Sequence, residues 1–117
     1  MFRPTTRAAL RVIADVTVVP IGTPTASLSG YVARVIKLFR EPERNLNPRT
    51  HAYGTNIEGD STDVFAAITD AHTLLHDELD VARVNTVIKL GSRTDQDGYN
   101  MDYKLKRIDE QLGDNNE

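Results

Sequence analysis

The stretch VTVVPIGTPTASLSGYVARVI, residues 16–36, contains the change of pattern that decides the fold. Residues 12–19 are nearly all apolar and mostly β-branched, so they predict a strand whose alternate side chains point to opposite faces. Pro20 and Gly22 end this strand, because proline lacks a backbone donor and glycine readily adopts turn conformations.

A helix is expected after that turn. Apolar side chains recur at spacings of three and four residues from Leu28 to Phe39, which places them on one stripe of a helix. Thr25 or Ser27 can cap this helix with a side-chain oxygen. The helix stops before Pro42.

A connector and a second stretch of strand character follow. Residues 42–48 are polar and contain two prolines, so they predict an exposed connector. Residues 50–58 are extended in character but interrupted by Gly54, which fits either one bent strand or two strands in a tight hairpin. We favour the hairpin.

The second half of the sequence again predicts a helix followed by a strand. The helix ends near Leu79, and residues 81–90 alternate between two faces as a strand does. Residues 100–112 predict a third helix with a narrow apolar stripe, which we expect to pack on a neighbour. The candidate caps of the second helix are Asp60, Ser61 and Thr62.

The resulting order, β-α-β-β-α-β-α, predicts an α+β fold of the ferredoxin-like kind. In this βαββαβ sandwich, two helices cover one face of an antiparallel four-stranded sheet, and here a C-terminal helix is added. The other face is left bare, and a second copy of the chain packing sheet to sheet would cover it, so we expect a homo-oligomer. The side chains expected on that face are Asp15, Thr17, Val19, Arg83, Asn85, Val87 and Lys89.

Length and composition limit the possible classes of protein. A chain of 117 residues suits one domain, and the absence of cysteine excludes disulfides, thiolate catalysis and Cys-based zinc sites. With 17 acidic against 14 basic residues, nucleic acid is disfavoured as a partner. No apolar run approaches the roughly 20 residues of a membrane span, so we expect no membrane association.

Three parts of the chain are expected to behave differently. Residues 12–112 form the folded domain, and residues 113–117 are expected to be disordered. Residues 1–11 combine three arginines with threonines and no acid, which fits a flexible extension or, alternatively, a targeting segment.

Four segments, taken in order, resemble the thiamine-binding protein family. They are the opening stretch, HAYGTNIEG at residues 51–59, DVFAAITDAHTLLHDEL at residues 63–79, and RVNTVIKLGSRTDQ at residues 83–96. The resemblance implies a ferredoxin-like, non-catalytic cytoplasmic protein, dimeric or homotetrameric, that binds thiamine or its hydroxymethylpyrimidine moiety. The alternative is a structural or regulatory homo-oligomer without a physiological ligand.

A thiamine site needs partners for the edge of the aminopyrimidine and a flat surface for its ring. Glu58 can accept from that edge, although an acid at a strand end is also explained by solvent exposure. Thr55 offers a hydroxyl where Gly54 permits close backbone approach, or is simply a strand former. Tyr53 is a candidate for stacking on the ring.

Three further hydroxyls complete the candidate ligand-binding set. Ser27 and Ser29 stand at the start of the first helix, where free amides and hydroxyls bind polar ligand groups or serve as caps. Thr86 is the polar residue on an otherwise apolar strand face, where it contacts a ligand or satisfies a buried group.

The sequence supports a metal site or a catalytic site less well than a ligand-binding site. His72 and His76 lie one helical turn apart, but one packed and one surface histidine explain the spacing better than a metal pair. No arrangement of nucleophile, base and orienting group is evident, so the sequence predicts neither a cofactor nor enzymatic activity.

Overall fold

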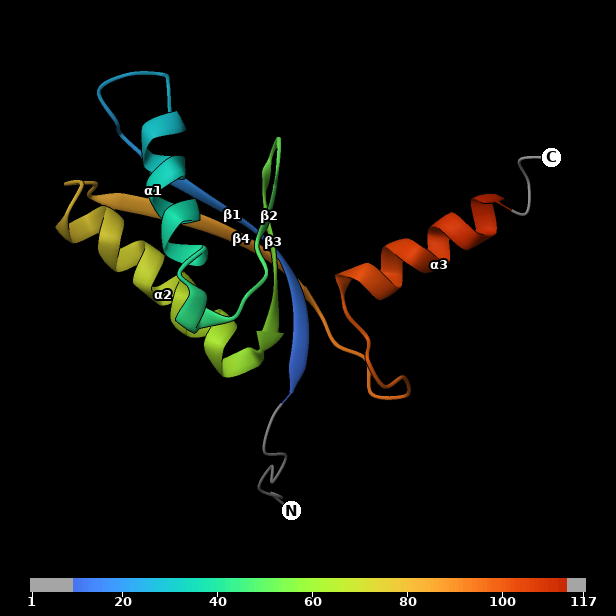
Figure 1. The fold of residues 1–117 in the computed structure, drawn as a ribbon. Helices are drawn as coiled ribbons and strands as arrows, with labels where there is room; N and C mark the ends of the chain where they lie inside the picture. Colours follow the sequence, from blue (N-terminus) through green and yellow to red (C-terminus); the bar gives the residue numbers. More distant parts are fainter. Residues whose placement is uncertain (1–9, 114–117) are drawn as a thin grey trace, which may run out of the picture.

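A computed structural model describes residues 10–113 of the chain (Figure 1). Four strands form one sheet in the order β2-β3-β1-β4, and every adjacent pair is antiparallel. This order and the third helix confirm the predicted ferredoxin-like arrangement. The elements are β1 (Arg11–Ile21), α1 (Ser29–Phe39), the 3-10 turn η1 (Pro42–Arg44), β2 (Arg49–His51), β3 (Gly54–Asp60), α2 (Ser61–Asp77), β4 (Arg83–Gly91) and α3 (Met101–Gly113).

The first strand holds the sheet together from its centre. β1 pairs with β3 on one side and β4 on the other, so that Val16 lies opposite both Thr55 and Ile88. The side chains of Val12, Ala14 and Val16 are at most 2% exposed. Since side chains alternate along a strand, these residues share one face with Thr55 and Ile88, while Asp15 points to the other.

Helices α1 and α2 lie together on the face of the sheet that carries this core (Figure 1). Phe39 of α1 is 1% exposed, and Val64 and Leu75 of α2 are fully buried. Burying an aliphatic or aromatic side chain of this size contributes roughly 1.5–3 kcal/mol, so this layer dominates the stability of the domain.

The connector between α1 and β2 is only partly exposed, so the sequence prediction for residues 42–48 is wrong at one position. Leu46 is 1% exposed and belongs to the core. Its carbonyl accepts a hydrogen bond from the backbone amide of Glu58 at 2.9 Å. Asn45 and Asn47 on either side have φ angles of 54° and 48°, a left-handed conformation that turns the chain so that Leu46 points inward.

The side-chain hydrogen bonds predicted to cap α1 and α2 are also not formed. Leu28 occupies the N-cap position of α1 with helical dihedrals and no capping side chain, while the Thr25 hydroxyl donates to the Ser27 carbonyl instead. Asp60 is at the N-cap position of α2, as expected, but its side chain makes no capping bond. The loop before α1 enters the helix through Leu28, which already has helical dihedrals. The Thr25 hydroxyl therefore bonds within the loop and does not cap the helix.

Helix α3 extends away from the sheet on the side opposite to α1 and α2 (Figure 1). Met101, its first residue, is 5% exposed, whereas Leu105, Ile108 and Leu112 are each more than half exposed. The radius of gyration is 16.9 Å, against about 13 Å for a compact domain of this length. The predicted packing of this helix on a neighbour therefore stays a prediction.

Most residues of the two chain ends that were predicted to be flexible lie outside the described part of the chain. These are residues 1–9 and 114–117; Arg11 already belongs to β1, and Gly113 ends α3. Within residues 10–113, no helix combines the length and the apolar character needed to cross a membrane.

Candidate ligand-binding site

A cavity of about 200 Å³ lies between α1 and the turn joining β2 to β3, on the helix-covered face of the sheet. We call it the helix-face cavity. Val18 forms part of its floor, Leu28 and Phe39 contribute from α1 and its entrance, and Tyr53 and Thr55 contribute from the hairpin. Two of the six residues predicted to bind a ligand thus line the same cavity.

The hairpin reaches β1 closely enough to form this cavity because residue 54 is glycine. A Cβ atom at Gly54 would lie 2.6 Å from the Val16 carbonyl oxygen and 2.8 Å from Thr17 Oγ1. The Thr17 hydroxyl in turn donates to the Tyr53 carbonyl at 2.8 Å, which fixes the turn. The side chain of Tyr53 is 85% exposed and stands at the edge of the cavity.

Thr55 contributes a hydroxyl group to the cavity. Its side chain is on the core face of β3, and the residue is only 4% exposed. Within the described part of the chain, its hydroxyl has no hydrogen-bond partner, yet no fully buried side-chain oxygen is left unsatisfied there. The Thr55 hydroxyl is therefore accessible from the cavity and can donate or accept a bond to a ligand.

Ser27 and Ser29 stand at the entrance to α1, on either side of the cavity-lining Leu28. Their hydroxyl oxygens lie 3.3 Å apart, and both residues are exposed. They are near the cavity along the chain but do not line it. A contact between either serine and a ligand stays a prediction.

Thr86 lies on the helix-covered face, opposite Val18 in the register of β1 and β4. Its hydroxyl is 2.6 Å from Nε2 of His72 on α2, so it joins a helix to the sheet. Burial, together with repulsion from His76, lowers the pKa of His72, which keeps the ring neutral at pH 7. The bond to His72 does not test whether Thr86 also contacts a ligand, so that contact stays a prediction.

His76 also makes a contact at the end of α2. Its Nδ1 donates to the Val81 carbonyl at 2.7 Å, and the two rings meet edge to face with centroids 6.2 Å apart. Among residues 10–113, no cluster of three or more histidine, aspartate or glutamate side chains is arranged to hold a metal ion. Both histidines thus make structural contacts.

Glu58 lies on the opposite face of the sheet from Thr55 and is 4% exposed. Oε1 accepts a hydrogen bond from the Met101 backbone amide at 2.8 Å, and Oε2 accepts one from Asn47 Nδ2 at 2.7 Å. Arg11 approaches to 4.0 Å. The carboxylate therefore joins the connector, β3 and the start of α3, and it is separated by the sheet from the helix-face cavity.

Sequence reasoning missed a second and larger cavity, on the face of the sheet that the first two helices leave bare. Its volume is about 510 Å³, and α3 forms one wall. We call it the sheet-face cavity. Asp15, Arg49, His51 and Lys89 line it from the strands. The alternation of side chains along β1 and β4 placed Asp15 and Lys89 on this face, but nothing in the sequence placed α3 over them.

Residues 14–109 match the sequence model of a family described as thiamine-binding protein. This chain belongs to the thiamine-binding protein family. The match covers β1 from its fourth residue, the other three strands, both covering helices and most of α3. It confirms the resemblance carried by the four sequence segments.

Members of the thiamine-binding protein family resemble this chain over most of their length. The UPF0045 protein sll0230 of Synechocystis is 41% identical over 101 residues, which are 86% of this chain and 79% of that one. The crystal structure of the hypothetical protein MJ1052 of Methanocaldococcus jannaschii has 37% identity and a TM-score of 0.73, covering 86% of this chain and 97% of that chain.

The fold extends to a protein of Thermotoga maritima that is described in terms of thiamine biosynthesis and salvage. Its structure has a TM-score of 0.66 and covers 84% of this chain and 98% of that chain, with 15% identity. At this identity the likeness concerns the fold alone.

Proposed function

We propose that this chain is a non-enzymatic cytoplasmic protein that binds thiamine or its hydroxymethylpyrimidine moiety in the helix-face cavity. The observation that carries the proposal is the Thr55 hydroxyl, which opens to a largely apolar cavity and has no hydrogen-bond partner among residues 10–113, in a member of the thiamine-binding protein family. A hydroxyl away from bulk water gains from a hydrogen-bond partner, and a ligand can supply one.

The size of the cavity favours the pyrimidine half of thiamine as the enclosed part. Its volume of about 200 Å³ is below the roughly 300–1,000 Å³ typical of sites that enclose drug-sized ligands, but it suits one substituted ring. Val18 and Phe39 offer the ring an apolar surface, and Thr55 offers its nitrogen edge a hydrogen bond. A thiazolium at the mouth would lie near Tyr53, whose ring face attracts a cation.

Calorimetry with hydroxymethylpyrimidine and thiamine tests this proposal through Thr55→Val, which keeps the shape and removes the hydroxyl. We expect the variant to bind hydroxymethylpyrimidine about tenfold more weakly, the usual effect of losing one buried hydrogen bond. The ligand should be recovered chemically unchanged after long incubation with the wild-type protein.

Thr50→Val is the matched control, because Thr50 lies opposite Thr55 on the neighbouring strand but does not line the cavity. It should bind as the wild type does. Equal binding by Thr55→Val and the wild type would place the ligand elsewhere, and absence of any binding by the wild type would refute the proposal.

A second candidate function, a structural or regulatory homo-oligomer, is supported by exposed apolar side chains away from both cavities. Val87 on the bare face of the sheet is 67% exposed, and Leu112 at the end of α3 is 55% exposed. A second copy of the chain would cover such side chains. A dimer or tetramer is compatible with ligand binding, so both roles can hold together.

A further inference from the structure

The sheet-face cavity has the features of a second binding site. Its volume of about 510 Å³ falls within the range of small-molecule sites. Ile13 lies on its floor, Tyr99 and Met101 close one end, and Leu105 and Ile108 of α3 form an apolar wall. The sheet lies between it and the helix-face cavity, and His51 at the sheet edge is the one lining residue that the two cavities share, so the sheet-face cavity needs an explanation of its own.

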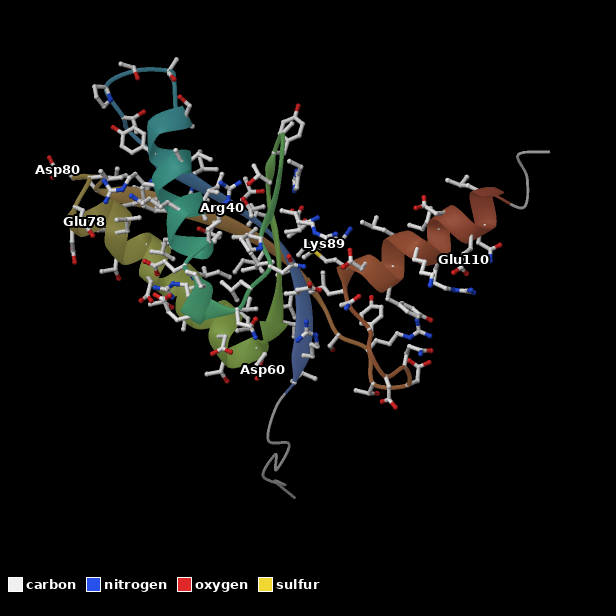
Figure 2. The ribbon with its side chains drawn as sticks, viewed as in Figure 1. Arg40, Asp60, Glu78, Asp80, Lys89 and Glu110 are labelled. Atoms are coloured by element: carbon white, nitrogen blue, oxygen red, sulfur yellow. The ribbon has the colours of Figure 1, made fainter. Side chains whose placement is uncertain are left out.

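The charges around this cavity are unbalanced in favour of cations. Lys89 on β4 and Lys104 on α3 both line it, and neither side-chain ammonium group has an ion pair or hydrogen bond within residues 10–113. Figure 2 shows Lys89 on the side of the sheet that faces α3. The whole chain has a net charge of −3, so two unpaired lysines in one cavity form a local positive site.

The other charged groups of the cavity are already paired, and their pairing fixes its walls. Nε2 of His51 lies 2.6 Å from Oδ1 of Asp15, within the sheet. Arg49 on β2 donates to Asp102 on α3 at 2.6 Å, which ties the helix to the edge of the sheet. The Asn56 amide, which also lines the cavity, has no partner among the described residues and can donate to a ligand.

We infer that the sheet-face cavity binds a small phosphate monoester with an aromatic or other apolar body. The phosphate group lies between Lys89 and Lys104, whose two charges match those of a dianion, and it accepts a further hydrogen bond from Asn56. The apolar body packs against Ile13, Leu105 and Ile108. This inference concerns a different cavity from the proposed function and does not depend on it.

Titration of the full chain with phenyl phosphate, followed by calorimetry, tests the inference. Lys89→Gln and Lys104→Gln should each weaken binding about tenfold, as expected for loss of one hydrogen bond to a charged group. Lys106→Gln is the matched control, since Lys106 carries the same charge on α3 but does not line the cavity. Inorganic phosphate should bind more weakly than phenyl phosphate, because it lacks the apolar body.

Three results would overturn the inference: no binding of phenyl phosphate, equal losses in all three lysine variants, or equal affinity for inorganic phosphate. The variant Thr55→Val distinguishes this inference from the proposed function, because Thr55 lines the helix-face cavity and not the sheet-face cavity. It should leave phenyl phosphate binding unchanged. If it alone weakened that binding, phenyl phosphate would occupy the helix-face cavity, and the sheet-face inference would be wrong while the proposed function stood.

Discussion

Glu58 shows how far the role of one residue can differ from what its sequence context predicts. The segment around it predicted a carboxylate near the ligand, and the structure gives that carboxylate two hydrogen-bond donors inside the protein. These donors lie 11 and 43 positions away in the sequence. Local patterns cannot reveal such partners, because only the folded chain brings them together.

Glu58→Ala should lower the free energy of unfolding by about 3 kcal/mol, measured by urea denaturation. The substitution leaves the Met101 amide and the Asn47 side chain without their acceptor in a buried place. Glu58→Gln is the control, since it keeps an acceptor for Met101 and should cost less.

Unchanged stability of Glu58→Ala would contradict this structural role. The contact between Glu58 and a pyrimidine stays a prediction, and the same variant examines it. Weaker hydroxymethylpyrimidine binding by folded Glu58→Ala protein of wild-type stability would favour the ligand contact over the structural one.

At the scale of the element, hydrophobic periodicity predicted the helices and strands with ends within about two residues of those observed, whereas the predicted side-chain caps were wrong. The apolar stripes of α1 and α2 identified both helices because their burial against the sheet requires that spacing. The hairpin favoured for residues 50–58 is confirmed by β2 and β3, joined through Ala52 and Tyr53. The caps failed because hydroxyls in a loop have several acceptors within reach, and spacing does not select among them.

Gly54→Ala should lower the free energy of unfolding by about 1–3 kcal/mol, the usual effect of forcing an extra methyl group into a packed site. The new Cβ would be 2.6 Å from the Val16 carbonyl oxygen, so the hairpin must move away from β1. Because the hairpin lines the helix-face cavity, binding of hydroxymethylpyrimidine should also weaken.

Gly30→Ala, in the first turn of α1, is the control for Gly54→Ala. A Cβ at Gly30 would meet nothing within 4 Å, so this variant should range from neutral to about 1 kcal/mol more stable. Thermal unfolding of both variants makes the comparison. Equal stability of the two would show that the close approach at Gly54 is unimportant.

At the scale of the whole molecule, the order of the elements was predictable and the placement of α3 was not. The order of helices and strands restricted the fold to the ferredoxin-like arrangement, since sequential elements pack as neighbours. The path of α3 depends on contacts of Glu58 and Arg49 with residues far along the chain. The sheet-face cavity, which needs that path, therefore went unpredicted.

Leu112→Glu should shift an assembled protein toward monomers, measured by analytical ultracentrifugation. Leu112 is 55% exposed at the far end of α3 and does not line the sheet-face cavity, so the variant tests assembly without changing that cavity. A charge placed in an apolar interface is destabilising unless it finds a partner.

Lys106→Glu changes charge on the same helix without altering its apolar stripe, and it should leave the assembly unchanged. A monomeric wild-type protein at high concentration would contradict the oligomer proposal. Assembly that persists in Leu112→Glu would show that the contact lies elsewhere, with the exposed Val87 on β4 as the next position to change.

The tight turn at Ala52 and Tyr53 fixes the register of β3, and the register decides which polar side chain reaches each cavity. Thr55 and Asn56 are consecutive on β3, so they face opposite sides of the sheet and each supplies a polar group to a different cavity. A slip of β3 by a single residue would exchange them, placing an amide in the helix-face cavity and a hydroxyl beneath α3. Insertions or deletions in this hairpin should therefore alter both cavities at once, whereas substitutions at either residue alter only one.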